Sequence, residues 1–299
     1  MEYICNDCPR QCGVVRAEVR QEGQVLPGFC HSPLQPVVAR AALHEWEEPC
    51  ISGSRGSGAV FFTGCNLRCC FCQNTTISMG GTGVPITAAR LRDIYGELIE
   101  KGAHNINLVT PTPYKKAILE SLAEPLPVPV VYNCGGYETT ATIDAFKGKV
   151  QIYLPDLKYL DPALAKRYSA AEDYPQVAAE AILHMYDQIG PYELDDDGLL
   201  QRGVVIRHLI LPGCLDNTKA VIDWVRDHFA DGQVLFSLMR QYVPCGRAAD
   251  YPEINRRLTD EEYDEAEQYL FDSGIEDGFV QEKDSASEAF IPAFDGTGV

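Results

Sequence analysis

Short apolar segments alternate with amphipathic helical patterns along most of this chain, and this alternation constrains its fold more than any other feature. The six segments that have the length of buried strands are 59–62, 106–109, 128–132, 150–154, 203–211 and 234–238. Thr87 and Asn217 are predicted helix N-caps, and Thr259-Asp-Glu-Glu262 is a capping box for a last helix that ends at Gly274. Since strands joined by helical crossovers pair in parallel, we predict an α/β fold with a parallel sheet.

Polar and small side chains gather at the C-terminal ends of the predicted strands. In a barrel of parallel strands the active site lies at this edge. The residues that the rule places there include Thr110, Thr112, Asn133, Asp156, Lys158 and Arg207. We therefore expect a functional site built from several strand ends. His208 lies in the fifth strand, and we interpret it as a buried structural histidine.

Four of the 12 cysteines lie between positions 65 and 72, directly after the first strand. Cys65, Cys69 and Cys72 have the spacing C-x3-C-x2-C, whereas Cys70 in place of Cys69 gives spacings that are strained for a cluster. Three thiolates on one loop can hold three corners of a [4Fe–4S] cube, which normally takes four cysteines. One iron then stays open to a small ligand, as the metal does in catalytic zinc sites. The alternative is a zinc site completed by a ligand from elsewhere.

The same run reads C-x3-C-x-aromatic-C, with Phe71 in the aromatic position, and so resembles the signature of the radical S-adenosylmethionine (radical SAM) superfamily. Residues 52–65, 156–158, 211–213 and 239–244 resemble the pyruvate formate-lyase activating enzyme-like branch. The resemblance implies a partial (β/α)6 TIM-like barrel with a [4Fe–4S] cluster whose open iron binds S-adenosylmethionine. It implies reductive cleavage of this cofactor to a 5′-deoxyadenosyl radical that abstracts hydrogen. The substrate is open: a glycine of a glycyl-radical enzyme, another peptide and a small molecule all fit.

The resemblance also implies contacts to S-adenosylmethionine. Asp156 and Lys158 match an Asp-x-Lys motif near the cofactor's carboxylate and a monovalent cation, and Arg207 pairs with the same carboxylate. The segment 110–112 stands where the family usually has Gly-Gly-Glu, so threonine oxygens or backbone carbonyls must hold the amino group. Asn133 is a further expected contact. The electron is expected from a protein donor such as flavodoxin or ferredoxin.

A second set of cysteines lies at the N-terminus: Cys5, Cys8, Cys12 and Cys30. Four thiolates can close a tetrahedral zinc site or hold a complete Fe–S cube. The spacing suits both, so the sequence predicts a second metal site and leaves its metal open. A cube would relay electrons, whereas zinc would fold the N-terminal arm.

Single cysteines follow three of the predicted strands. Cys134, Cys214 and Cys245 could face the cavity and donate hydrogen to a substrate radical or bind substrate, and Tyr242 is a candidate for the same work. The alternative is that each cysteine is a small apolar residue of the core.

Composition limits the partners. The chain has 25 Lys and Arg against 43 Asp and Glu, a net charge of −18, which disfavours nucleic acid. The most apolar stretch, 204–211, is too short to cross a membrane, and the first residues do not resemble a signal peptide, so we expect a cytoplasmic protein. We expect a cysteine-rich extension at 1–50, a barrel at 51–280 and a tail at 281–299. The rival functions are a non-catalytic iron–sulfur electron carrier and a zinc-bound structural module.

Overall fold

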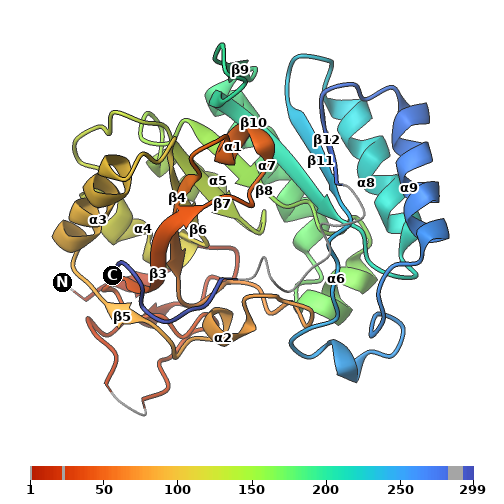
Figure 1. The fold of residues 1–299 in the computed structure, drawn as a ribbon. Coiled ribbons are helices and arrows are strands. Elements are labelled where there is room, and N and C mark those ends of the chain that lie inside the picture. Colours follow the sequence, from red (N-terminus) through yellow and green to blue (C-terminus); the bar gives the residue numbers. More distant parts are fainter. Residues whose placement is uncertain (1, 22–23, 282–291) are drawn as a thin grey trace.

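The computed structural model describes residues 2–21, 24–281 and 292–299, and it shows a large twisted sheet whose longer helices pack on one face (Figure 1). The six predicted strands are neighbours in this sheet in their chain order, and each pairs in parallel with the next. They are β4 (Ser57–Phe62), β6 (Ile106–Val109), β7 (Val130–Cys134), β8 (Ile152–Pro155), β10 (Leu200–Leu209) and β11 (Leu235–Met239). This confirms the predicted α/β class with a largely parallel sheet.

The helices lie between successive strands, as the crossover pattern predicts. They are α3 (Ala88–Glu100), α4 (Lys115–Ser121), α5 (Thr140–Ala145), α6 (Pro162–Ser169), α7 (Tyr174–Ile189), α8 (Leu215–His228) and α9 (Asp260–Ser273). Thr87 caps α3, and Thr259 with Glu262 forms the predicted capping box of α9. The predicted cap at Asn217 is wrong: α8 begins earlier, and the Asn217 carboxamide instead accepts a hydrogen bond from the backbone N–H of Leu160.

Side chains alternate between the two faces of the parallel strands, since successive residues of a strand point to opposite sides. One face packs in the large core with the helices, and Val60, Leu108 and Tyr132 belong to it. The opposite face carries a smaller apolar cluster that includes Val131 and Leu154. Two residues further along the strands, on this same opposite face, the side chains become polar and line a cavity.

Several elements have no counterpart in the predicted pattern. Strand β3 (Val37–His44) pairs antiparallel with β4, so the main sheet begins inside the predicted extension 1–50. The shorter unpredicted strands are β1 (Ile4–Cys5), β2 (Val14–Val15), β5 (Val84–Pro85), β9 (Glu193–Leu194) and β12 (Gly278–Val280). Short helical segments lie at α1 (Pro49–Ser52), α2 (Thr75–Ser78), η1 (Thr112–Tyr114) and η2 (Ala248–Asp250). In the described part of the chain the sheet is not closed, and β12 and β5 form its two ends.

The C-terminal residues lie against β3. The N–H of Gly296 donates to Ala39, and the N–H of Ala41 donates to Thr297. Phe294 packs edge-on against Phe61, with ring centroids 5.5 Å apart. The end of the tail therefore covers the edge of β3, whereas the predicted tail's residues 282–291 lie outside the described residues.

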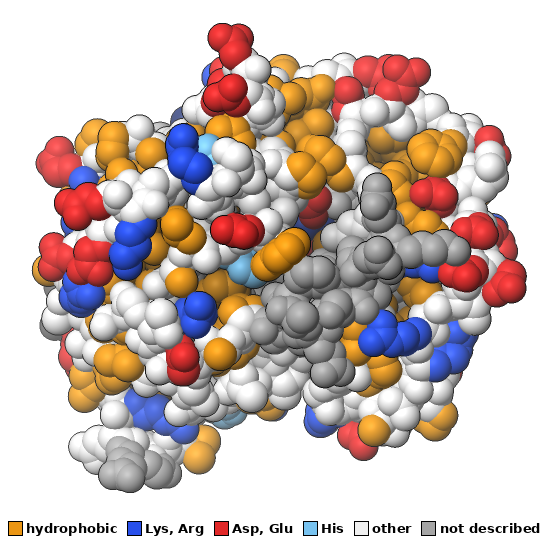
Figure 2. Space-filling view, in the orientation of Figure 1, with side chains coloured by type: hydrophobic (Ala, Val, Ile, Leu, Met, Phe, Trp, Pro, Cys, Tyr) orange, Lys and Arg blue, Asp and Glu red, His pale blue; other side chains and the backbone are white. Residues whose placement is uncertain are grey.

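Acidic side chains gather on the outer side of α9 and around the turn that follows β9 (Figure 2). Both regions are exposed, so water solvates much of the excess negative charge. Among the described residues, no helix has both the length and the apolar character that a membrane crossing requires.

Candidate functional site

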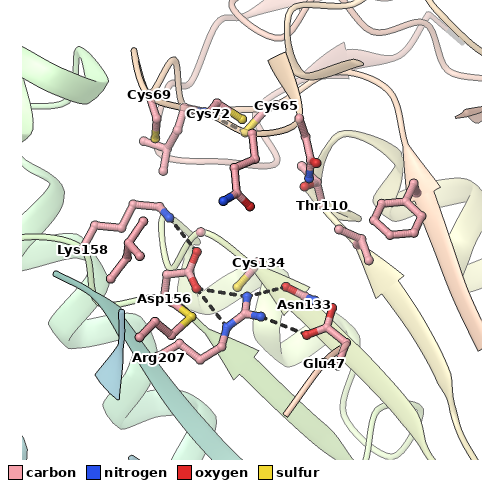
Figure 3. A pocket seen from close by; sticks show the side chains of 18 of the residues that line it. Glu47, Cys65, Cys69, Cys72, Thr110, Asn133, Cys134, Asp156, Lys158 and Arg207 are labelled. Atoms are coloured by element: carbon pink, nitrogen blue, oxygen red, sulfur yellow. Dashed lines mark hydrogen bonds and ion pairs between the residues drawn. The ribbon is translucent and has the colours of Figure 1, made fainter. Parts of the chain in front are cut away.

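The loop after β4 brings three cysteines to one wall of the cavity. Cys65, Cys69 and Cys72 all line it, and Figure 3 shows them together above the charged side chains of the strand ends. Cys70 instead lies in the helix-covered core with 2% of its surface exposed. The loop therefore separates the cysteines of the C-x3-C-x2-C pattern from the fourth cysteine of the run.

A hydrogen-bond donor lies beside two of the three sulfurs. The backbone N–H of Leu67 lies 3.3 Å from Sγ of Cys65, and the Ser169 hydroxyl donates to Sγ of Cys69 at 3.0 Å. Burial raises the pKa of the Cys65 and Cys72 thiols, and the positive charge of Lys158 opposes this rise. Such donors and a nearby cation favour thiolates, which are the form that binds metal.

This donor set fits an iron–sulfur cluster. Three soft sulfur ligands share one open cavity, and such a set suits iron held by thiolates. Among the described residues, no group of three or more His, Cys, Asp or Glu side chains is already arranged to hold a metal ion. The match therefore rests on the chemistry of the donors and on their shared cavity.

A network of charged side chains forms the opposite wall (Figure 3). Asp156 receives Nζ of Lys158 at 2.6 Å and Nε of Arg207 at 3.0 Å. Arg207 also contacts Glu47 at 3.1 Å and donates to the Asn133 carboxamide oxygen at 2.7 Å. Two carboxylates thus face two cations in a largely buried cluster.

The cations decide the protonation state of this wall. Burial alone would raise the pKa of Asp156, but the charges of Arg207 and Lys158 outweigh burial and hold the pKa below its usual value. Burial would likewise lower the pKa of Lys158, and Asp156 raises it instead. Asp156 and Lys158 are therefore both charged at neutral pH and form an ion pair.

Two glutamates of this region carried no signal in the sequence. Glu47 lies just before α1 and accepts the Asn133 amide at 3.1 Å, in addition to contacting Arg207. Glu48 is buried and accepts the Ser237 hydroxyl at 2.9 Å, and burial raises its pKa to about 7. A short non-periodic segment gives no indication of which face it presents, so only the fold reveals that Glu47 reaches the cavity.

The threonines of the expected cofactor contacts behave differently from each other. Thr110 lines the cavity and has a φ of 60°, a conformation that is rare for a β-branched residue and that concentrates at functional sites. Thr112 points away: its hydroxyl donates to the buried Glu138 at 2.5 Å, and it is not among the described residues that line the cavity. Its side chain is therefore placed to hold Glu138 and not a ligand of the cavity.

The candidates for hydrogen donation also separate. Cys134 lines the cavity, and burial raises the pKa of its thiol, so it keeps its S–H at neutral pH. Tyr242 donates to Ile254 at 2.7 Å, and Cys245 donates to Phe71 at 3.0 Å. Cys214 stands at the N-terminus of α8. In the described part of the chain, only the first of these four residues lines the cavity.

Two further predictions concern residues outside this cavity. His208 is buried, and its two ring nitrogens lie 2.7 Å from the Leu157 carbonyl and 3.0 Å from the Thr218 hydroxyl, which agrees with a structural histidine. The N-terminal cysteines lie together around a separate, smaller cavity, which is lined by Cys5, Cys8, Cys12 and Cys30.

Comparisons with known proteins give one curated relative and several solved structures. The chain is 30% identical over 273 residues to the uncharacterized protein MJ0674 of Methanocaldococcus jannaschii, and the match covers 88% of this chain and 72% of that protein. No protein-family model matches the sequence.

The similar solved structures include Streptococcus suis SuiB bound to S-adenosylmethionine, with 14% identity, a TM-score of 0.53 and coverage of 75% of this chain and 52% of that chain. SuiB bound to the precursor peptide SuiA gives 12% identity, a TM-score of 0.51 and coverage of 73% and 46%. The chain therefore spans about half of the SuiB length. At these identities the comparison shows a shared fold.

Proposed function

Because this chain belongs to the same family as the uncharacterized protein MJ0674 of Methanocaldococcus jannaschii and shares its fold with a protein solved with S-adenosylmethionine bound, we propose that it is a radical SAM enzyme. One observation carries the proposal. The cysteines of the C-x3-C-x2-C loop and the charged side chains at the ends of β8 and β10 line the same cavity. The open parallel sheet also has the strand order that a partial (β/α)6 barrel needs.

In this proposal Cys65, Cys69 and Cys72 hold three irons of a [4Fe–4S] cluster, and the cavity receives S-adenosylmethionine at the fourth. When bound, the two groups supply one electron and a sulfonium bond, whose cleavage gives methionine and a 5′-deoxyadenosyl radical that removes hydrogen from a substrate. The protein binds and orients the cofactors and limits the access of water. The electron comes from a protein donor such as flavodoxin or ferredoxin.

The charged wall offers partners to both the carboxylate and the ammonium group of the methionine part of S-adenosylmethionine. Lys158 and Arg207 offer positive charge to a carboxylate, as the sequence resemblance implies. Glu47 offers a carboxylate to an ammonium group, which would take the place of the Asn133 amide at Oε1, because Oε2 contacts Arg207. The chain has Thr-Pro-Thr where the family usually has Gly-Gly-Glu. We therefore assign the amino group of the cofactor to the region of Glu47 and Asn133, with Thr110 at its side.

The resemblance also implies a monovalent cation near Asp156, but cationic side chains already occupy this carboxylate. Each of its two carboxylate oxygens already contacts a cationic side chain, Oδ1 that of Arg207 and Oδ2 that of Lys158. A bound cation would have to displace one of them. We therefore favour Lys158 as the positive charge beside the carboxylate of the cofactor.

For the substrate we propose only a chemical class, because the described cavity wall fits more than one kind of molecule. The cavity wall also includes His44, Trp46, Phe61 and Pro292, so part of it is apolar or aromatic. The activase-like branch makes a glycine of a glycyl-radical enzyme one candidate, and another peptide or a small molecule fits the same wall. The electron-carrier alternative gives no role to a cavity with three thiols and a balanced charge network.

The experiment uses the chain purified anaerobically with its cluster. Dithionite-reduced protein is mixed with S-adenosylmethionine, and 5′-deoxyadenosine is measured by liquid chromatography. We expect release from the wild type, no release from Cys69→Ala, and release from the matched control Cys70→Ala, whose thiol lies in the core. A wild type that holds zinc alone, or that releases no 5′-deoxyadenosine with a reduced cluster, would contradict the proposal. Release from C69A with loss in C70A would overturn the assignment of ligands.

A further inference from the structure

The four N-terminal cysteines meet although they come from two separate segments. Cys5 ends strand β1, Cys8 and Cys12 lie in the turn before β2, and Cys30 comes from a loop beyond the hairpin. The N–H of Gly13 donates to the Cys5 carbonyl at 3.0 Å, and the N–H of Gln11 donates to the Cys8 carbonyl at 3.0 Å. These bonds fold the turn tightly, and all four side chains then line one small cavity.

A backbone amide and a buried cation face two of the sulfurs in this cavity. The backbone N–H of Phe29 lies 3.4 Å from Sγ of Cys12, and the guanidinium of Arg16 lies 3.4 Å from Sγ of Cys30. Arg16 is 8% exposed, so its charge acts at close range in a site that excludes water. Its positive charge would offset part of the negative charge of thiolates that bind a metal in this cavity.

The size of the cavity excludes a small organic ligand. Its volume is about 10 Å³, which is close to the space that one water molecule needs. A site with four soft ligands and no room for a substrate matches a closed metal centre, in which every coordination position belongs to the protein. The four sulfurs are not yet arranged as a finished coordination sphere, so binding includes rotation of their side chains.

The N-terminal and the central cysteine loops are also joined by hydrogen bonds. Arg10, between Cys8 and Cys12, donates to the Asn66 carbonyl at 2.9 Å and to the Ala170 carbonyl at 2.6 Å. In return Arg68 of the central loop donates to the Phe29 carbonyl at 2.9 Å. Both guanidinium groups lie against the Phe29 ring, at 3.8 Å for Arg10 and 4.2 Å for Arg68.

Two consecutive residues line the two cavities. Asn66 lines the small cavity, and its neighbour Cys65 lines the large one. The Asn66 carboxamide also donates a hydrogen bond of 2.5 Å to the Tyr137 carbonyl. This bond holds residues 65–66 against the loop that follows β7. A metal that orders the N-terminal turn would therefore also act on the start of the central loop.

We propose that Cys5, Cys8, Cys12 and Cys30 bind a second metal centre, closed by four thiolates, that braces the central cysteine loop through Arg10. The shared chemistry is a thiophilic metal, and zinc and iron in an Fe–S cluster are its two sources. A single zinc ion matches the small cavity, whereas an Fe–S cube also requires the four cysteines to move apart. Metal binding by the four N-terminal cysteines does not depend on the proposed radical SAM function. The bracing of the central loop through Arg10 does depend on that function.

The first test removes the central ligands and asks what metal stays. The full chain with Cys65→Ala, Cys69→Ala and Cys72→Ala is purified anaerobically, and iron, sulfide and zinc are measured per chain. We expect the content of one centre, about four irons with sulfide or about one zinc. Adding Cys8→Ser and Cys12→Ser should remove this metal, and adding the control Cys214→Ser should leave it.

A folded triple variant without iron or zinc would overturn the proposal, as would metal that survives C8S and C12S. Where the variants do not fold, the wild-type chain gives the answer. Its thiols are alkylated with iodoacetamide before and after removal of metal with a chelator, and the peptides are analysed by mass spectrometry. We expect the four N-terminal cysteines to become reactive together when metal leaves, and labelling that is independent of metal would contradict the site.

The second test addresses the bracing. In Arg10→Ala we expect the central iron to be lost to a chelator several-fold faster, with the metal of the second centre retained. Arg55→Ala is the matched control, because Arg55 contacts Gly102 and His104 instead. Equal rates of iron loss in R10A and wild type would overturn the bracing role. Failure of SAM cleavage in a wild type that keeps the second metal would count against the proposed function alone.

Discussion

The chain carries two cysteine sites that differ in what surrounds the sulfurs. The central loop presents three thiols to a cavity of about 250 Å³ with a wall of paired charges, whereas the N-terminal turn presents four thiols to a cavity of about 10 Å³ with one buried arginine. The first has fewer ligands and more room, so a bound metal can take a ligand from outside. The second has a full set of ligands and no room. Ligand number and cavity size together distinguish a site for chemistry from a site for structure or electron relay.

The largest effect of a conservative change is expected at the charged wall of the central site. Asp156→Asn removes the carboxylate that Lys158 and Arg207 share, and leaves both cations short of a counter-charge. Two charged hydrogen bonds at about 1.5 kcal/mol each correspond to about a 100-fold lower rate. We expect this fall in 5′-deoxyadenosine release per cluster, while the N-terminal metal content stays constant. Asp223→Asn, at an exposed ion pair with Arg226, is the control. A wild-type rate in D156N would show that the charged wall is not needed for cleavage of S-adenosylmethionine.

A smaller effect is expected from Glu47→Gln. Arg207 keeps Asp156, but the cavity loses one carboxylate and the proposed partner of the ammonium group. One charged hydrogen bond of about 1.5 kcal/mol corresponds to about a tenfold rise in KM for S-adenosylmethionine. Steady-state kinetics of 5′-deoxyadenosine formation measure this change. If KM stayed at the wild-type value, the amino group would have to lie elsewhere in the cavity.

At the closed site the corresponding change is Arg16→Met, which keeps an apolar stem and removes the buried charge. Arg16 also donates to the Pro113 carbonyl, so the variant tests its two contacts together. We expect the N-terminal metal to be released to a chelator several-fold faster than from the wild type. Colour or zinc-dye absorbance follows the release over time. Unchanged release would show that the four thiolates need no counter-charge.

The smallest effect concerns stability and lies at neither cysteine site. Burial lowers the pKa of His208 from 6.5 to about 4. As the pH falls from about 6.5 toward 4, the unfolded histidine binds a proton that the folded one refuses, so the free energy of unfolding decreases. We expect the drop in Tm between pH 7.5 and pH 5 to be smaller in His208→Asn than in the wild type. Equal drops would assign the acid sensitivity to other groups.

The sequence predicts the site where strand periodicity and strand ends coincide. Val131 and Asn133 lie on one face of β7, and Leu154 and Asp156 lie on one face of β8 and its extension, so an apolar floor continues into a polar wall two residues on. The rule that active sites lie at strand ends predicts the residues of this wall from the sequence alone. It also placed the central cysteines beside it.

Other features depend on contacts that no local pattern encodes. Thr112 begins a 3-10 turn that directs its hydroxyl to Glu138, although its neighbour Thr110 faces the cavity. Glu47 reaches the cavity because the chain crosses the sheet face before β4. Asn217 has the side chain of a helix cap, but its position against residues 160–161 gives its oxygen a different partner.

Binding of S-adenosylmethionine to the reduced wild-type protein, followed by electron paramagnetic resonance, tests the difference between the two sites most directly. We expect the cofactor to change the spectrum of the centre that depends on Cys65, Cys69 and Cys72. We also expect any signal that depends on Cys8 and Cys12 to be the same with and without the cofactor. A spectrum of the central cluster that is the same with and without the cofactor would contradict an open iron at that loop.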